Sequence, residues 1–281
     1  MTISKSVSLK TIDKIHISMP FSRIAEIRLR AGRSAVLTDI CGNMEVCSPP
    51  FTGGEIADVF NEICGYSLYS HQSEIAEGYV TLQGGHRVGI CGTAVYKDGK
   101  IDFIKDISGL NIRIAHEIPG CAEKLYKQVF SEGLTSLLIV GKPLSGKTTL
   151  LRDLARLLSV KHRVCIIDSR NEISACCRGT PGFDIGLNTD VLCGFGKAEG
   201  IMTALRTLSP EIIICDEIGD DGDVFRQCSY CGVKITASAH SGSLEELHRR
   251  FDERILSCFE QTVLLGDGCG ITADNQRGCG M

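Results

Sequence analysis

The sequence predicts an α/β protein in which a smaller α+β domain precedes a core built on a parallel sheet. Three observations support this prediction. In the second half of the chain, helix-length segments alternate with short, continuously apolar runs at residues 137–140, 164–167, 212–215 and 233–237. Runs that are apolar on both faces are typical of a parallel sheet covered by helices. In the first half, apolar residues instead alternate with polar ones or recur at a helical spacing. The length of 281 residues fits two domains.

The first half contains one clear strand pattern and one clear helix pattern. In residues 24–30, Ile27 and Leu29 fall on one face of a strand, and the arginines between and after them fall on the other. In residues 54–64, the apolar side chains are spaced by three and four positions, so they form one face of a helix. We therefore expect a half-buried strand followed by an amphipathic helix.

Two hairpins and a linker complete the predicted organisation. Glycines at 84–85 and the Lys-Asp-Gly-Lys segment 97–100 each separate two strand-like runs, as turns of antiparallel hairpins do. Ile-Pro-Gly at 118–120 then interrupts the pattern. We expect an N-terminal α+β domain over residues 1–118 and a nucleotide-binding α/β domain over 119–265. The glycine- and cysteine-rich remainder, residues 266–281, is expected to be a flexible tail.

Composition excludes several classes of protein. The net charge is −4, from 30 Lys and Arg against 34 Asp and Glu, which counts against a nucleic-acid partner. The longest apolar runs are too short to span a bilayer, and the N-terminus lacks the apolar core of a secretory leader. We expect a cytoplasmic chain without a transmembrane segment of its own.

The 15 cysteines are scattered along the chain and are odd in number. In a reduced cytosol they are expected to be free and mostly buried as small apolar residues. The alternative is a zinc site in which Cys228 and Cys231 join the tail cysteines Cys269 and Cys279. The sequence favours the first interpretation because cysteine is among the residue types most often buried in proteins.

A phosphate-binding loop follows the first apolar run. Residues 141–148 match the pattern G-x-x-x-x-G-K-[ST] between a predicted strand and a predicted helix, which is the context this motif requires. We assign nucleotide binding to Gly141, Lys142, Pro143, Leu144, Ser145, Gly146, Lys147, Thr148 and Thr149. Lys147 is expected to contact the β- and γ-phosphates of ATP, and the Thr148 hydroxyl is expected to bind Mg²⁺.

Acidic residues follow two other predicted strands. Asp216 and Glu217 follow the run 212–215, and we expect Asp216 to hold the metal ion through water and Glu217 to polarise the attacking water. Asp168 and Glu172 follow the run 164–167, where they are either catalytic or helix-capping groups. His240, at the end of another strand, either senses the γ-phosphate or caps the next helix.

Together these segments resemble the type II/type IV secretion ATPases, and in particular a branch of that family that acts in endospore formation. The segments that carry the resemblance are 26–30, 84–89, 111–114, the P-loop with 149–153, 206–219 and 239–240. The resemblance extends from about residue 14 to 265. It implies a RecA-like P-loop NTPase core after a smaller α+β domain, a hexamer, and nucleotide bound at the cleft between the domains.

The resemblance also implies roles for individual residues. Asp168 and Glu172 correspond to the family's acidic box and His240 to its histidine box, so all three are catalytic candidates with Glu217. Arg113 ranks above Arg87 and Arg206 as a phosphate contact, although each of the three could serve as an arginine finger. Ser169 stands where the sporulation proteins usually have Glu, so Asp168 and Glu172 alone carry the acidic box.

The expected function is therefore that of an ATPase motor that uses ATP and Mg²⁺. The resemblance implies a homo-hexamer on the cytoplasmic face of the mother-cell membrane, docked on membrane channel proteins of the sporulation apparatus. Two alternatives stay open: an ATPase stimulated by nucleic acid, and a structural ring that binds nucleotide without hydrolysing it.

Overall fold

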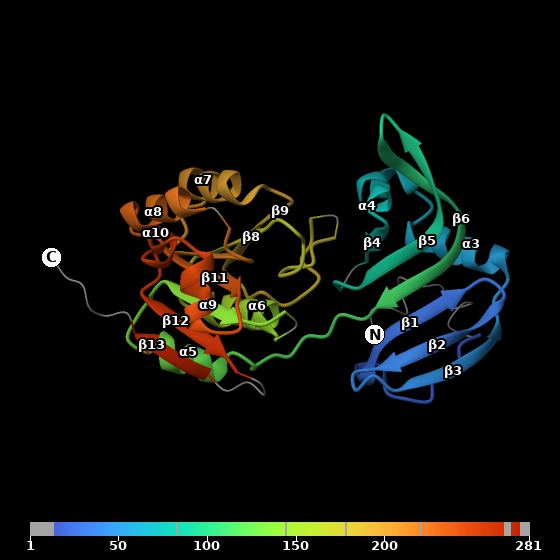
Figure 1. Ribbon diagram of the computed structural model, residues 1–281, viewed down its shortest axis with the longest axis horizontal. Helices are drawn as coiled ribbons and strands as arrows, with labels where there is room; N and C mark the ends of the chain where they lie inside the picture. Colours follow the sequence, from blue (N-terminus) through green and yellow to red (C-terminus); the bar gives the residue numbers. More distant parts are fainter. Residues whose placement is uncertain are drawn as a thin grey trace. The chain divides into compact units, whose positions relative to one another are not determined.

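The structure is a computed structural model that describes residues 14–82, 84–143, 145–177, 179–219, 221–266 and 271–275. The chain divides into two units (Figure 1). The first contains the chain up to His116 together with Ala175–Gly182, and the second contains Glu117–Ser174 and the chain from Phe183 onward. The division after His116 lies two residues before the predicted boundary. The return of residues 175–182 to the first unit was not predicted.

The first unit is built on a six-stranded antiparallel sheet. In spatial order its strands are β3 (Met44–Pro50), β2 (Arg33–Asp39), β1 (Ile24–Arg30), β6 (Lys100–Arg113), β5 (Arg87–Lys97) and β4 (Tyr79–Thr81). Both predicted hairpins are present, as β4–β5 and β5–β6. In the second, Asp98 and Gly99 have φ angles of 52° and 77°, as a two-residue turn with positive φ at both positions requires.

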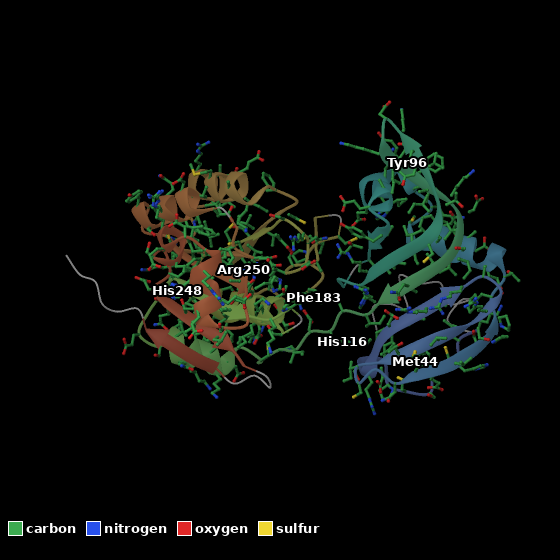
Figure 2. The ribbon with its side chains drawn as sticks, in the orientation of Figure 1. Met44, Tyr96, His116, Phe183, His248 and Arg250 are labelled. Atoms are coloured by element: carbon green, nitrogen blue, oxygen red, sulfur yellow. The ribbon has the colours of Figure 1, made fainter. Side chains whose placement is uncertain are left out.

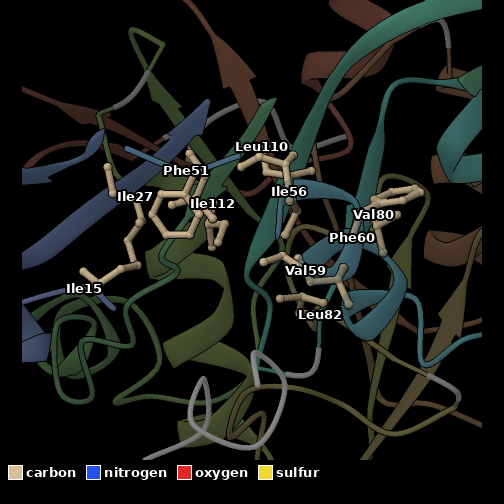
Figure 3. Close-up of a cluster of buried hydrophobic side chains, with 14 of the residues drawn as sticks. Ile15, Ile27, Phe51, Ile56, Val59, Phe60, Val80, Leu82, Leu110 and Ile112 are labelled. Carbon is tan, nitrogen blue, oxygen red and sulfur yellow. The ribbon is translucent and has the colours of Figure 1, made fainter. Parts of the chain in front are cut away.

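Helix α3 (Gly53–Ile63) confirms the helix predicted from the apolar spacing. Its N-terminus is closed by a capping box, in which the Thr52 hydroxyl accepts from the Glu55 N–H and the Glu55 carboxylate accepts from the Thr52 N–H. Ile56, Val59 and Phe60 are buried in the same core as side chains of the sheet (Figure 3). The remaining helical elements of this unit are η1 (Phe21–Arg23), η2 (Leu68–His71) and α4 (Gln72–Ala76).

The second unit is built on a seven-stranded sheet that is parallel except at one edge. Its strands, in spatial order, are β13 (Ile271–Asn275), β12 (Gln261–Leu265), β7 (Leu137–Gly141), β11 (Lys234–His240), β10 (Ile212–Cys215), β8 (Val164–Asp168) and β9 (Thr189–Cys193). The predicted parallel-sheet core is thus confirmed.

Helices cover both faces of this sheet. Leu137 and Ile139 face a core shared with α5 (Glu123–Val129) and α6 (Lys147–Leu158). Leu138 and Val140 face the opposite core, which includes side chains of the other four helices. Those helices are α7 (Lys197–Thr207), α8 (Gly222–Tyr230), α9 (Leu244–Arg250) and α10 (Glu253–Leu256). Because successive strand residues point to opposite faces, a strand buried on both sides has to be apolar at every position.

The predicted tail requires a correction. Residues 271–275 form β13, which pairs antiparallel with β12. A glycine-rich composition predicted no regular structure here, but the exposed backbone edge of β12 offers hydrogen bonds that local composition does not encode. Residues 267–270 and 276–281, the rest of the predicted tail apart from Gly266, lie outside the described part of the chain.

Of the four cysteines in the alternative zinc site, Cys228 and Cys231 are described and are free thiols. Cys228 is buried and Cys231 is exposed, whereas Cys269 and Cys279 fall outside the described residues. Within the described ranges, no group of three or more His, Cys, Asp or Glu side chains is arranged to hold a metal ion. No helix among these residues combines the length and the apolar character needed to cross a bilayer.

Candidate nucleotide-binding site

The P-loop connects the end of β7 to the first turn of α6. Gly146, the residue before the helix, has a left-handed φ of 88°, and no side chain caps the helix N-terminus. A Cβ atom on Gly141 would lie 2.6 Å from the hydroxyl oxygen of Ser145, so a larger residue there would force the Ser145 side chain to shift. The buried Ser145 hydroxyl has no hydrogen-bond partner. Uncapped helix N–H groups and an unpaired hydroxyl are hydrogen-bond donors of the kind that bind phosphate at a helix N-terminus.

Lys147 is held inside this loop and is 5% exposed. Its ammonium group donates to the carbonyl oxygens of Gly141, at 2.8 Å, and Lys142, at 2.7 Å. It also donates to Nδ1 of His240 at 2.9 Å. Burial lowers the pKa of Lys147, and the nearby carboxylates of Asp216 and Glu217 oppose that effect. All three ammonium hydrogens therefore have partners within the chain, so phosphate would replace one or more of these contacts.

His240 connects Lys147 to the acidic side of the site. An ammonium group can only donate, so Nδ1 of His240 accepts and the proton of the neutral ring lies on Nε2. That Nε2 atom lies 3.8 Å from the carboxylate of Glu217. Asp216, the neighbouring carboxylate, accepts from the Ser238 hydroxyl at 3.0 Å. Lysine, histidine and glutamate thus form a continuous polar row across the site.

The sheet explains why these residues meet. Strands β7, β11 and β10 are adjacent and parallel, so their C-terminal ends lie at one edge. In register, His240 on β11 is the partner of Gly141 on β7. Ligands of open parallel sheets bind outside this edge.

A cavity of about 420 Å³ lies at this edge. It is lined by Pro143, Ser145, Gly146, Lys147, Thr148, Thr149, Arg170, Glu172, Asp216, Glu217 and His240. The structure thus brings together most of the predicted site. Gly141 and Lys142 contribute their carbonyl groups to Lys147, and Leu144 lies outside the described residues. Arg113 is exposed on β6 of the first unit, so its contact with nucleotide stays a prediction.

The structure places Asp168, one of the predicted catalytic residues, away from the cavity. Asp168 is fully buried and is not among the residues that line the cavity. One carboxylate oxygen accepts from the N–H groups of Glu172 and Ile173, at 2.9 and 3.3 Å. The other accepts from the N–H and the hydroxyl of Ser174, at 2.8 and 2.6 Å. These four donors occupy the carboxylate, so Asp168 shapes the loop that carries Glu172, and its catalytic role stays a prediction.

Arg170 was not predicted. It lies in this same loop, lines the cavity and pairs with Glu217 at 3.4 Å. The arginines predicted to contact phosphate are at 87, 113 and 206, of which Arg206 is exposed in the last turn of α7. The feature of the sequence that could have identified Arg170 as a site residue is its position between Asp168 and Glu172, the two residues of the predicted acidic box.

Arg152 of α6 contacts the residues on both sides of the segment Ala175–Gly182. Its guanidinium donates to the carbonyl oxygens of Ile173, at 2.7 Å, and Glu172, at 2.8 Å. It also lies 3.6 Å from the ring centre of Phe183, which is labelled in Figure 2. Between these contacts the chain runs through Ala175–Gly182, which belongs to the first unit. Through Arg152, helix α6 therefore contacts the chain on both sides of Ala175–Gly182.

The donor set fits a nucleotide with Mg²⁺. The Thr148 hydroxyl and the Asp216 carboxylate line the same cavity and offer the oxygen ligands that Mg²⁺ prefers. A magnesium ion in a phosphate site needs only one or two protein ligands, because phosphate oxygens and water supply the others. The unpaired Ser145 hydroxyl and the Lys147 ammonium supply donors for the phosphate oxygens.

Comparison with known sequences now places the chain. The profile of the family described as "Sporulation stage III, protein AA" matches residues 4–273. The chain belongs to this family. It is 38% identical over 235 residues to stage III sporulation protein AA of Bacillus subtilis, covering 81% of this chain and 76% of that protein. It is also 30% identical over 175 residues to the protein SEEDLING PLASTID DEVELOPMENT 1 of Arabidopsis thaliana, covering 57% of this chain and 24% of that protein.

Solved structures with the same fold include an ATPase and a pilus retraction motor. The pilus retraction motor PilT with bound ADP has a TM-score of 0.59 at 16% identity, covering 89% of this chain and 77% of that one. The ATPase DotB of Yersinia pseudotuberculosis has a TM-score of 0.58 at 15% identity, covering 90% and 74%. The predicted resemblance and the predicted P-loop fold are thus both confirmed.

Proposed function

We propose that this chain binds ATP with Mg²⁺ and hydrolyses it to ADP and phosphate. The observation that carries the proposal is the row formed by Lys147, His240 and Glu217 beside the P-loop. It puts a cation for phosphate and a carboxylate for water on two sides of one cavity. This placement is the basis of P-loop catalysis, which works by positioning and electrostatics.

Each residue has a distinct task in this proposal. Lys147 exchanges contacts with its own loop for phosphate oxygens, and the N–H groups at the start of α6 bind the same anion. Thr148 and Asp216 hold Mg²⁺, which neutralises charge on the phosphates. Glu217 orients the attacking water and takes up its proton, while His240, with its proton on Nε2, stays beside that carboxylate. Glu172, which also lines the cavity, is the second carboxylate of the proposed catalytic set.

We further propose that the chain acts as a hexameric motor of the secretion-ATPase type during endospore formation. Support comes from the family and from the fold shared with ATPases, one of which is named as a pilus retraction motor. The proposed location is the cytoplasmic, mother-cell side of a membrane channel that the hexamer powers or helps to assemble. The net charge of −4 argues against nucleic acid as the partner.

Phosphate release from Mg²⁺-ATP by the purified chain tests the enzymatic proposal. We expect Lys147→Ala to lose both binding and turnover, and Glu217→Gln to bind ATP but to hydrolyse it about 10²- to 10⁴-fold more slowly. Lys161→Ala and Glu199→Gln, which change exposed residues away from the cavity, are the matched controls. Hydrolysis by Glu217→Gln at the wild-type rate would show that Glu217 is not catalytic.

Two further measurements separate the alternatives. The mass in solution, with and without the nonhydrolysable analogue AMP-PNP, tests the hexamer, which we expect nucleotide to favour. A mass that stays that of one chain would contradict the ring. Stimulation of turnover by single-stranded DNA or RNA, lost at high salt, would instead support the nucleic-acid alternative. Binding without any phosphate release would support the structural ring.

A further inference from the structure

Arg170 is a cation in the cavity that the roles described above leave unused. It is 66% exposed, lines the cavity and pairs with Glu217 at 3.4 Å. Glu217 is thus approached by the Arg170 guanidinium and also by the His240 ring. In this arrangement the proposed catalytic carboxylate is held in an ion pair.

The backbone that carries Arg170 is held in place. Asp168 accepts the N–H groups of Glu172, Ile173 and Ser174, directly after Arg170 and Asn171. Asn171 has a left-handed φ of 55°, which turns the chain sharply at this point. Arg152 fixes the same stretch from the other side through the carbonyls of Glu172 and Ile173. A fixed backbone with an exposed guanidinium leaves the side chain as the part that can change partners.

The charges around the cavity favour such a change. Among the described residues that line the cavity, Lys147 and Arg170 carry positive charges, and Glu172, Asp216 and Glu217 carry negative charges. A triphosphate adds several negative charges to this acidic surface. Lys147 is expected to serve both the β- and the γ-phosphate, so a second cation beside the γ-phosphate would share in neutralising its charge. A planar guanidinium can give two parallel hydrogen bonds to a phosphate, as a lysine cannot.

We propose that Arg170 binds the γ-phosphate of the nucleotide held in its own subunit and makes the site prefer the triphosphate to the diphosphate. By leaving Glu217 for the γ-phosphate, Arg170 frees that carboxylate to orient water. In the ADP state it returns to Glu217. This inference rests on the proposed function, because it requires that the P-loop binds nucleotide.

Calorimetry with AMP-PNP and with ADP, both in Mg²⁺, tests the inference on the full chain. We expect wild type to bind AMP-PNP more tightly than ADP. Arg170→Ala should lose at least about tenfold in AMP-PNP affinity, the value of a charge-assisted hydrogen bond, and change ADP affinity by less than about threefold. Arg170→Lys should restore part of the preference. Arg226→Ala, which removes an exposed arginine paired with Asp223 on α8, is the matched control and should change neither affinity.

The same measurements in the Glu217→Gln variant test whether Arg170→Ala changes AMP-PNP affinity only by removing the ion pair with Glu217. In Glu217→Gln the ion pair with Arg170 is absent, yet Arg170→Ala should still lower AMP-PNP affinity by a similar factor. If Arg170→Ala leaves the ratio of AMP-PNP to ADP affinity unchanged in both backgrounds, the inference is wrong while nucleotide binding stands. If wild type binds neither nucleotide, the proposed function fails and the inference fails with it.

Discussion

Replacing Asp168 with asparagine distinguishes a residue that shapes the loop from one that takes part in the chemistry. The carboxylate is fully buried and accepts from three N–H groups and one hydroxyl. In Asp168→Asn, an NH₂ group replaces one oxygen. If it replaces the oxygen that faces Ser174, the serine hydroxyl can rotate to accept from it, but the Ser174 N–H loses its acceptor. If it replaces the other oxygen, the N–H groups of Glu172 and Ile173 lose theirs.

The cost can be estimated from these contacts. A buried N–H without a partner costs about 1–3 kcal/mol, and the remaining hydrogen bonds lose the assistance of the negative charge. We expect the free energy of unfolding of the second unit to fall by about 2–4 kcal/mol. Asp223→Asn, at a side chain that is 91% exposed, is the control and should change it by less than about 0.5 kcal/mol.

The assay needs a signal from the second unit alone. The chain has no tryptophan, but Cys165 and Cys215 are buried in this unit and become reactive when it unfolds. Urea-dependent thiol labelling of these two residues, read by mass spectrometry, gives the required free energy. An Asp168→Asn protein of unchanged stability whose ATP turnover is lost would refute the reasoning and return Asp168 to the catalytic groups.

Two other predictions follow from close packing and from a buried titratable group. Gly141→Ala places a Cβ atom 2.6 Å from the Ser145 hydroxyl, so nucleotide affinity measured by calorimetry should fall by about tenfold or more. Gly53→Ala, with nothing within 4 Å, should not change it. Burial lowers the pKa of His86 to about 4, and its ring accepts the Ala115 N–H. In the unfolded chain His86 has its usual pKa of about 6.5, so it takes up a proton as the pH falls from 7 to 5, whereas in the folded chain it stays mostly neutral over this range. The free energy of unfolding, measured in urea, should therefore fall by about 2 kcal/mol between pH 7 and pH 5. His86→Asn keeps an acceptor that does not titrate and should flatten this dependence; an equal loss in both proteins would contradict the assignment.

Local sequence was sufficient to predict the elements of the fold. The P-loop could be recognised because its residues are contiguous, and its function depends on backbone N–H groups that any chain with this glycine spacing presents. Helix α3 and the strand at residues 24–30 could be predicted because burial on one face imposes a period on the sequence. The general position of Asp216 and His240 followed from the rule that parallel strands end at one edge.

The partners of the site residues could not be predicted in the same way. Lys147 and His240 are 93 residues apart in the chain, and Arg170 and Glu217 are 47 apart. Their contacts depend on which strands are neighbours and on how each loop turns. A periodicity reports which face of an element is buried, but it does not report what lies opposite that face.

The sequence by itself thus determined the two-part organisation, the phosphate-binding loop and the acidic residues after the strands, because local spacing encodes each of these. The tertiary structure alone decided that Asp168 points into the protein, that Arg170 faces Glu217, and that residues 175–182 join the first unit. The physical reason is that a carboxylate after a strand can accept hydrogen bonds from its own loop or bind a ligand. Only the folded structure shows which hydrogen-bond donors lie next to the carboxylate.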